Sequence, residues 1–438
     1  MRSLSTDNYT KVQELRAIVS DTGFSEWQDL EAEGQRRIAG AIAPGENIQA
    51  IVSPHTQEEL AAVMGWAYQQ RWGVLPYGSG TKLNWGGLVQ GAHLAISTAR
   101  LHQVIEHAAG DLTVTVEAGV KFGELQQILA SAGQFLAFDP AYPEEATIGG
   151  IVATADTGSW RQRYRGIRDQ LLGISLVRYD GKIAKAGGRV VKNVAGYDLM
   201  KLLTGAYGTL GIISQVTLRV YPLPEASGTV VLSGDAIALA KATQTLLSSA
   251  LTPTAVDLLS APCAEKLGVA KTKALMVRFQ SVAESVKEQS ARLLAIGEQL
   301  GLQGSERIES DEADLWQRLK QQMWTTERES AIICKLGVLP AQAVEMMQEF
   351  PLETIVIHAG SGLGVLRLEA GTPERLLQLR HWCESKAGFL TILAAPLELK
   401  QRLEVWGYNG NALALIQRIK QQFDPENLFS PHRFVREV

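Results

Sequence analysis

A glycine-rich cluster with hydroxyl side chains follows a strand-like run at 74–77 and could bind a phosphate group. Its residues are Pro76, Tyr77, Gly78, Ser79, Gly80, Thr81, Lys82 and Leu83. Glycines permit left-handed backbone and let a ligand approach the main chain, while the hydroxyls of Ser79 and Thr81 add donors. This suits a pyrophosphate; the alternative is a purely structural turn. Because position 83 is Leu and no G-x-x-x-x-G-K-[ST] occurs, Rossmann and P-loop fingerprints are excluded.

A second cluster combines small residues with hydroxyl groups after a loop that contains Pro140. Its members are Thr147, Gly149, Gly150, Ala153, Asp156, Thr157 and Gly158. A flat ring system needs walls of this kind, with little side-chain bulk and with backbone groups free to bond heteroatoms. The alternative is a tightly packed start of a helix.

A third cluster lies at 192–199 and continues through 205–213. Its glycines, which include Gly208 and Gly211, lead into the β-branched pair Ile212 and Ile213. The alternative is a glycine that ends a helix before a strand. One such cluster decides nothing, but three in the same half of a chain are harder to explain as turns alone.

Strand and helix signals alternate around these clusters. Thr56 and Glu59 form a capping box that opens a helix ending near 71, and Asp180-Gly181 predicts a hairpin turn. Strands are expected at 48–52, 74–77, 93–97, 112–117, 172–179, 182–186 and 212–220, with a further helix at 121–132. Crossover and hairpin connections together predict a mixed α/β first half.

The run 221–224 (YPLP) ends the first half, and a second pattern follows it. Helices are expected at 237–249, 283–300 and 412–423, with strands at 274–279 and 332–336. A chain of 438 residues is too long for one core. We therefore expect an α+β protein with three parts, at 1–225, 226–400 and 401–438.

Composition excludes several classes of protein. The net charge of −4 and the lack of a basic stripe argue against nucleic-acid binding. No stretch of about 18 apolar residues and no signal-peptide pattern occur, so we expect a cytoplasmic protein, with peripheral membrane attachment through partners left open. The three cysteines, Cys263, Cys334 and Cys383, form no C-x-x-C pair, which excludes a Cys-ligated iron–sulfur cluster within this chain.

The three clusters resemble the FAD-binding domain of the vanillyl-alcohol oxidase and p-cresol methylhydroxylase (PCMH) superfamily, firmly over 48–222. Within it the chain is similar to the family of FAD-binding E subunits of glycolate dehydrogenase (glycolate oxidase). The resemblance implies a PCMH-type domain of two α/β subdomains and an α+β cap. It implies that 78–81 hold the FAD pyrophosphate and that 211–213 meet the adenine end. The second cluster would line the flavin and ribityl side, and further cofactor contacts are implied at Pro140, Ala153, Tyr164 and Gly208.

Departures from the family pattern matter as well. Thr81 stands where some relatives attach FAD covalently through His, so non-covalent binding is expected. Relatives that oxidise 2-hydroxy acids carry H-x-G-D-G-N-x-H, but here His358 is followed by Ser361, Leu363 and Val365 at the Asp, Asn and second His positions. A lone His cannot build such a metal site, so no metal is expected. His358 is then a candidate catalytic base or a structural residue.

The tail and the third cluster also depart from the pattern. Relatives often carry Glu where Tyr207 stands. The tail Ser430-Pro431-His432-Arg433 resembles a family N-P-G-[KR] ending, so Arg433 is expected either near the flavin or on the surface.

The resemblance implies a non-covalent FAD subunit of a multi-subunit dehydrogenase for glycolate or D-lactate. Its flavin would accept hydride or relay electrons to an iron–sulfur subunit, with a catalytic flavoprotein subunit oxidising most of the substrate. Two alternatives stay open. One is a self-sufficient flavoenzyme for another substrate that uses His358, Arg367 or Tyr408; the other is a scaffold without FAD. The basic stretch 161–165 is expected to be solvated or to face a partner.

Overall fold

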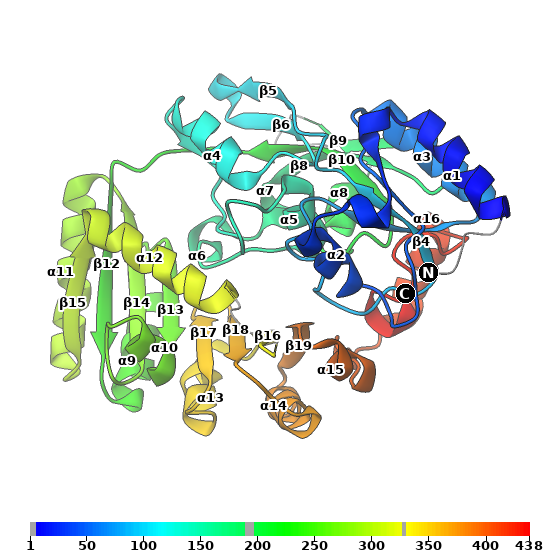
Figure 1. Ribbon diagram of the computed structural model, residues 1–438. Helices are drawn as coiled ribbons and strands as arrows, with labels where there is room; N and C mark the ends of the chain where they lie inside the picture. The colour runs from blue at the N-terminus through cyan, green and yellow to red at the C-terminus, as the bar shows by residue number, and fades with distance from the viewer. Residues whose placement is uncertain (1–5, 189–196, 326–329) are drawn as a thin grey trace. The chain divides into compact units, whose positions relative to one another are not determined.

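The computed structural model describes residues 6–188, 197–325 and 330–438 (Figure 1). The chain divides into two compact units. Unit 1 comprises 1–156, 166–222 and 408–438, and unit 2 comprises 157–165 and 223–407. Segment 157–165 thus belongs with the second unit, and the last thirty-odd residues return to the first. Among the described residues, no helix is both long and apolar enough to cross a membrane.

The first sheet of unit 1 has the strand order β1-β2-β4-β3. Its strands are β1 (Phe24–Ser25), β2 (Ala50–Val52), β3 (Gly73–Tyr77) and β4 (Ala92–Ser97). Helix α3 (Gln57–Gln70) connects β2 to β3 and starts at the predicted cap, where the Glu59 N–H donates to Thr56 Oγ1 at 3.0 Å. Because β2 and β3 both run parallel to β4, this crossover brings the end of β3 to the same edge as the end of β4. Helices α1 (Thr6–Ile18) and α2 (Ala32–Ala39) complete this part.

The second sheet of unit 1 is antiparallel, in the order β5-β6-β10-β8-β9. Its strands are β5 (Val104–Ala108), β6 (Thr113–Glu117), β8 (Leu171–Val177), β9 (Ile183–Gly187) and β10 (Ile212–Arg219). The predicted hairpin joins β8 to β9 with Gly181 at φ +76°. Its helices are α4 (Phe122–Ala130), α5 (Ile148–Thr154), α7 (Ile167–Gln170) and α8 (Leu199–Leu203), and a small ladder pairs β7 (Gln134–Phe135) with β11 (Tyr221–Pro222). Apolar side chains of α4, α5 and α8 share one core with the sheet.

Unit 2 contains an eight-stranded antiparallel sheet in the order β15-β12-β14-β13-β17-β18-β16-β19. The strands are β12 (Ala226–Ser233), β13 (Ala255–Leu259), β14 (Ala274–Ser281), β15 (Gln303–Ile308), β16 (Ile332–Gly337), β17 (Thr354–His358), β18 (Leu363–Leu368) and β19 (Phe389–Ala394). Sequence reasoning expected only two of them, because most lack a clear alternation of polar and apolar residues.

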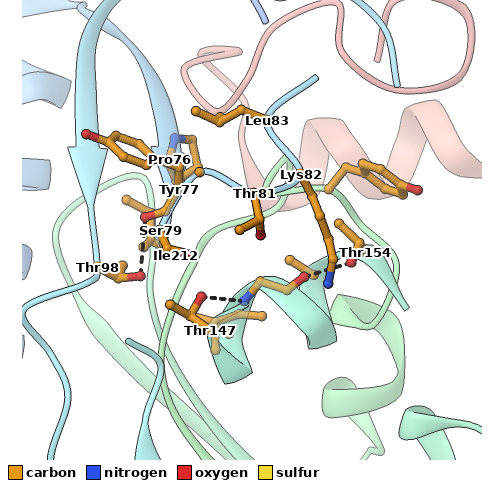
Figure 2. Close-up of a pocket in the computed structure, with 18 of the residues that line it drawn as sticks. Pro76, Tyr77, Ser79, Thr81, Lys82, Leu83, Thr98, Thr147, Thr154 and Ile212 are labelled. Atoms are coloured by element: carbon orange, nitrogen blue, oxygen red, sulfur yellow. Dashed lines mark hydrogen bonds between the residues drawn. The ribbon is translucent and has the colours of Figure 1, made fainter. Parts of the chain in front are cut away.

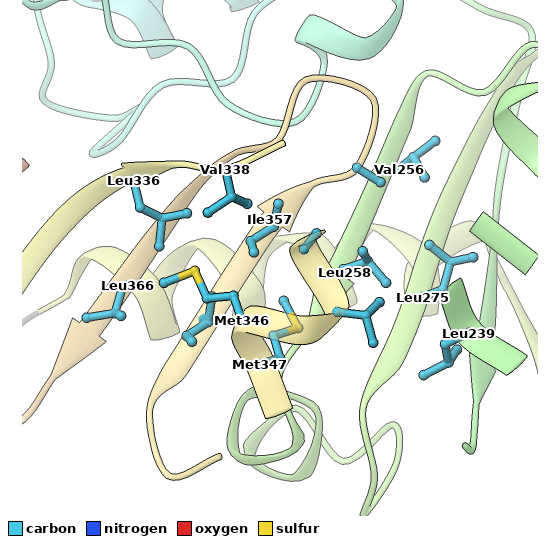
Figure 3. Close-up of a cluster of buried hydrophobic side chains, with 14 of the residues drawn as sticks. Leu239, Val256, Leu258, Leu275, Leu336, Val338, Met346, Met347, Ile357 and Leu366 are labelled. Atoms are coloured by element: carbon cyan, nitrogen blue, oxygen red, sulfur yellow. The ribbon is translucent and has the colours of Figure 1, made fainter. Parts of the chain in front are cut away.

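The two faces of this sheet bury different partners. On one face, Val256, Leu258 and Ile357 pack in a wholly apolar core (Figure 3) with helices α9 (Ala236–Leu247), α11 (Ala283–Gln299), α13 (Ala343–Glu349) and α14 (Pro373–Ser385). On the other face, α10 (Ala261–Lys266) and α12 (Glu309–Trp324) cover a smaller core. Alternation along the strands places Asp257 and His358 on this second face.

Segment 157–165 is anchored within unit 2. Ser159 donates to Asp257, and the Trp160 ring lies under the Arg278 guanidinium at 5.7 Å. Helix α6 (Arg161–Tyr164) occupies the basic stretch. That stretch was expected to be solvated or partner-facing; Arg163 and Arg165 are exposed, whereas Ser159 and Trp160 just before it make internal contacts.

The end of the chain is built into unit 1. Helix α16 (Leu413–Phe423) is followed by a segment that adds a parallel bridge to β3, pairing Val74 with Phe429. Phe429 is fully buried there.

A glycine-lined pocket and a buried Asp–His pair

Unit 1 contains a pocket that encloses about 820 Å³ of empty space, including its opening to solvent (Figure 2). The volume is in the range of small-molecule and cofactor sites. Of the residues predicted to bind a cofactor, the following line it: Pro76, Tyr77, Gly78, Ser79, Gly80, Thr81, Lys82, Leu83, Thr147, Gly149, Gly150, Ala153, Gly208, Gly211, Ile212 and Ile213. All three glycine clusters therefore meet at one cavity.

Five predicted contacts do not line the pocket. Asp156 instead pairs with Lys82 and accepts the N–H of Ala141. Pro140, which precedes Ala141, does not line the pocket either. Thr157, Gly158 and Tyr164 belong to unit 2. Thr157 and Gly158 were predicted as members of the second cluster and Tyr164 from the resemblance, but the chain leaves unit 1 after Asp156.

Seven lining residues were not among the predicted contacts. They are Thr98, Ala146, Thr154, Leu203, Ala206, Tyr207 and Arg433. Thr98 follows β4, which neighbours β3, so the parallel pairing was a usable signal. Arg433 was left open between pocket and surface; it is buried and lines the pocket.

The loop at 78–85, here called the glycine loop, turns its carbonyl oxygens toward the protein. The Gly78 oxygen accepts from Ser97 Oγ at 3.1 Å, and the Ser79 oxygen accepts from Arg37 Nη1 at 2.9 Å. In a trans peptide the next N–H points the opposite way. Within the described parts of the chain, the N–H groups of 78–82 donate to no protein acceptor. The loop is therefore a concave set of donors that fits a phosphate group.

Glycine is required at position 78 for a steric reason. A Cβ atom there would lie 2.1 Å from Thr147 Oγ1. The first and second clusters thus touch through Gly78, and Thr147 in turn caps α5 by accepting the Gly150 N–H at 3.3 Å. This contact fixes the distance between the glycine loop and the wall formed by α5.

Two buried cations flank the pocket. Lys82 Nζ lies 2.7 Å from Asp156 Oδ2 and 5.5 Å from the centre of the Trp85 ring. Burial lowers the pKa of Lys82, and the Asp156 carboxylate opposes that shift. Burial also lowers the pKa of Arg433 to about 10, so its guanidinium keeps its charge at neutral pH.

The described lining of the pocket offers neither an imidazole nor a thiol for covalent attachment of a flavin. No His or Cys is among the described residues that line it, and Thr81 offers only a hydroxyl. Two phenols are present, but burial raises the pKa of Tyr77 to about 12 and also raises that of Tyr207. Both phenols therefore stay protonated at neutral pH and are poor nucleophiles.

The candidate base His358 lies in unit 2 beside a fully buried carboxylate. Pairing of β13 with β17 sets Asp257 opposite His358, and Nδ1 of His358 lies 2.8 Å from Asp257 Oδ1. The other carboxylate oxygen accepts from Ser159 Oγ at 2.5 Å. Sequence reasoning missed Asp257, although a single Asp inside the apolar strand 255–259 was a usable signal.

The remaining candidates do not join this pair. Arg367 Nη1 donates to the carbonyl oxygens of Gln322 and Thr325 at the end of α12, and Tyr408 accepts the Ala412 N–H in unit 1. Among the described residues, no group of three or more His, Cys, Asp or Glu side chains could hold a metal ion.

Comparison with known proteins agrees with the pocket. The family described as FAD binding domain matches residues 48–187. Glycolate oxidase subunit GlcE of Escherichia coli is 30% identical over 82% of this chain and 92% of its own length. The mitochondrial D-lactate dehydrogenase [cytochrome] of Arabidopsis thaliana is 25% identical over 97% of this chain and 80% of its own. The match to glycolate oxidase subunit GlcD of Bacillus subtilis spans 46% of that protein.

Solved structures show the same fold. A structure of p-cresol methylhydroxylase with substrate bound superposes with a TM-score of 0.76 at 16% identity, covering 99% of this chain and 98% of that one. The expected fold class and cofactor are thereby confirmed. The chain therefore shares the fold of p-cresol methylhydroxylase and belongs to the family of FAD-binding glycolate oxidase subunits GlcE.

Proposed function

We propose that this chain is the non-covalent FAD-binding subunit of a multi-subunit dehydrogenase for glycolate or D-lactate. The observation that carries the proposal is the set of N–H donors of 78–82 on the wall of a pocket whose described lining residues include no His or Cys. Similarity to GlcE over most of the chain supplies the substrate class.

The glycine loop would hold the FAD pyrophosphate. Gly149, Gly150 and Ala153 of the α5 wall would accept a flat ring, since they present backbone rather than bulk. Gly211, Ile212 and Ile213 would meet the adenine end. Pro140, Asp156, Thr157, Gly158 and Tyr164 would act at most indirectly, because they do not line the cavity. Bound FAD would supply a hydride acceptor, which no side chain can provide.

His358 would accept the hydroxyl proton of the 2-hydroxy acid. Asp257 holds Nδ1, so the ring proton is expected on Nδ1 and Nε2 is the basic nitrogen. Ser159 fixes the carboxylate from its other oxygen, so the ring has one preferred orientation. This arrangement orients a base without a metal ion.

Ser361, Leu363 and Val365 stand where relatives carry metal ligands, and this replacement favours a division of the reaction between subunits. Most substrate oxidation would then occur on a catalytic flavoprotein subunit, with this chain relaying electrons to an iron–sulfur subunit. The three cysteines are buried and form no disulfides. Burial raises the pKa of each thiol to about 12, so none of them readily forms the thiolate that an iron–sulfur cluster needs as a ligand.

Purification of the chain alone and with its co-purifying partners tests the proposal. We expect a yellow protein whose flavin is released by acid, slow bleaching by glycolate or D-lactate in isolation, and fast bleaching in the complex. The variant His358→Gln should bind FAD normally and lose any bleaching in isolation. A colourless protein that fails to bind added FAD would leave only the scaffold alternative. Fast bleaching by the isolated chain would instead show a self-sufficient enzyme.

A further inference from the structure

The C-terminal segment 428–433 reaches across unit 1 to the glycine loop. It first bonds to β3, where Val74 N–H donates to the Leu428 oxygen at 2.7 Å and Ser430 N–H donates to the Val74 oxygen at 2.8 Å. It then bonds to the chain after the glycine loop, since Gly87 N–H donates to the Arg433 oxygen at 3.0 Å. The segment therefore touches both ends of the β3–loop turn.

Buried polar contacts hold this segment at its start. Lys420 Nζ lies 2.7 Å from Asp424 Oδ2 and also donates to the oxygens of Thr209 and Phe429. Asp424 accepts the N–H groups of Leu428 and Phe429 at 2.9 and 2.7 Å. Such a network is costly to bury and stabilises one arrangement only when every member is bonded.

The segment is also held in unfavourable backbone conformations. Ser430 and His432 have φ values of +41° and +68°, which side-chain-bearing residues rarely adopt. Residues in such conformations persist where their surroundings determine them strongly, and they gather at ligand-binding sites. The two strained residues lie just before Arg433, which lines the pocket.

Arg433 ends this segment as a buried guanidinium bonded to the glycine loop. Its Nη2 donates to the oxygens of Leu83 at 2.7 Å and of Trp85 at 3.0 Å, and lies 3.4 Å from the Lys82 oxygen. Two turns lie in the same stretch, with Leu83 N–H on the Gly80 oxygen and Trp85 N–H on the Lys82 oxygen. One side chain therefore holds the carbonyl oxygens at the ends of both turns.

We propose that Arg433 is a positioning residue for cofactor binding. By holding the carbonyl oxygens of 83 and 85, it keeps the N–H groups of 78–82 directed at the bound phosphate groups. This rests on the proposed function of the pocket. Because coupling between two binding events is reciprocal, binding of FAD then stabilises the docked segment 428–433 to the same extent that docking strengthens FAD binding.

Arg37 provides a matched comparison. It also donates to a carbonyl of the glycine loop, that of Ser79, but its guanidinium is part-exposed and is neutralised by Glu33 and Glu145. Arg433 is buried and the three acceptors above are uncharged carbonyls. When an exposed, ion-paired arginine is removed, water can take over its hydrogen bonds, whereas the partners of a buried arginine are left without a donor.

The test uses the full chain and measures FAD affinity by quenching of flavin fluorescence. We expect Arg433→Met and Arg433→Lys to raise the Kd for FAD on the order of tenfold or more, because bonds to a charged donor are lost. Arg37→Met should change it by less than about threefold. Millimolar guanidinium ion should restore much of the affinity of Arg433→Met, because it can refill the vacated site.

A second readout is hydrogen exchange at the amides of Gly87, Gln90 and Ser430, whose acceptors connect the segment to the rest of unit 1. Saturation with FAD should slow exchange at all three. Unchanged FAD affinity in both Arg433 variants, or unchanged exchange on adding FAD, would overturn the proposal. If Arg433→Met does not fold, the FAD affinity of Arg433→Lys decides, provided that this variant without FAD has the same Tm as the wild type without FAD. Failure of the wild type to bind FAD would instead contradict the function of the pocket itself.

Discussion

Each unit buries an aspartate beside a basic side chain, and the two pairs differ in what they can do. In unit 1, Asp156 faces Lys82, whose ammonium group stays close to the pocket wall. In unit 2, Asp257 faces His358 and has Ser159 on its other oxygen. In the first pair, Asp156 holds the lysine ammonium group in one place, whereas an imidazole held by a carboxylate can accept and return a proton. In the proposed function, the pocket therefore serves binding and the pair in unit 2 serves proton transfer.

The two regions also differ in how much they depend on individual side chains. The donors of the glycine loop belong to the main chain, so many sequences could build them if the glycines remain. The Asp257 pair depends on three particular side chains, and the positions after His358 have already lost the family's metal ligands. Variants of the two regions should therefore separate FAD binding from proton transfer.

The largest effect is expected from Lys82→Met, which leaves Asp156 buried without its cation. Removing one partner of a buried pair costs about 3–5 kcal/mol, so urea unfolding should show a loss of that size together with weaker FAD binding. The double variant Lys82→Met/Asp156→Leu should recover part of the stability. Equal stability of Lys82→Met and the wild type would show that the pair does not shape unit 1.

Asp257→Asn should impair substrate-dependent bleaching and leave FAD binding intact. The amide keeps the shape of the carboxylate but loses the charge that Ser159 and His358 bond, at a cost of about 1.5–3 kcal/mol in unfolding free energy. The Kd for FAD should stay within error of the wild type, while substrate-dependent bleaching falls. A change in FAD affinity as large as that in Lys82→Met would remove the distinction between the two regions.

Gly78→Ala tests the backbone character of the pocket. Its Cβ would meet Thr147 Oγ1, so we expect about 1–3 kcal/mol of lost stability or FAD-binding free energy from overpacking. Gly110→Ala is the control, since no atom lies within 4 Å of a Cβ there. Equal FAD affinity in both variants would mean that the loop and α5 are not in close contact when FAD binds.

A smaller effect concerns pH. Burial lowers the pKa of His93, and its Nδ1 accepts the Gly73 N–H at 3.2 Å at the start of β3. Because the unfolded chain binds this proton more readily, the stability of unit 1 should fall as pH drops below about 6.5. The loss attributable to this residue should be on the order of 1 kcal/mol or less and should be absent in His93→Gln. An identical pH dependence in both proteins would contradict it.

Local sequence was enough to predict much of unit 1. The capping box at Thr56, the hairpin at Asp180-Gly181 and the glycine loop after β3 all depend on neighbours within a few residues, so spacing reveals them. The contact of Gly78 with Thr147 and the bonds of Arg433 to Leu83 join distant parts of the chain. No local pattern encodes such contacts, which explains why the place of Arg433 was left open. Tyr207 lies inside the third cluster and was set aside only because relatives often carry Glu there.

Unit 2 was harder for a related reason. Most of its strands, such as β13, β17 and β19, are buried along nearly their whole length, so they lack the alternation that identifies a strand exposed on one side. The route of segment 157–165 depends on the bonds of Ser159 and Trp160 to unit 2, which form only in the folded protein. Thr157, Gly158 and Tyr164 therefore lie in unit 2, although the sequence pattern grouped them with the cofactor contacts of the first half.

The return of residues 408–438 to unit 1 has a consequence for biosynthesis. A ribosome makes the glycine loop early, but Arg433 and the strand partner of Val74 emerge only after all of unit 2 has been translated. Domains generally fold in the order of synthesis. Here the pocket is completed last, so nascent chains would expose an unfinished cofactor site while unit 2 folds.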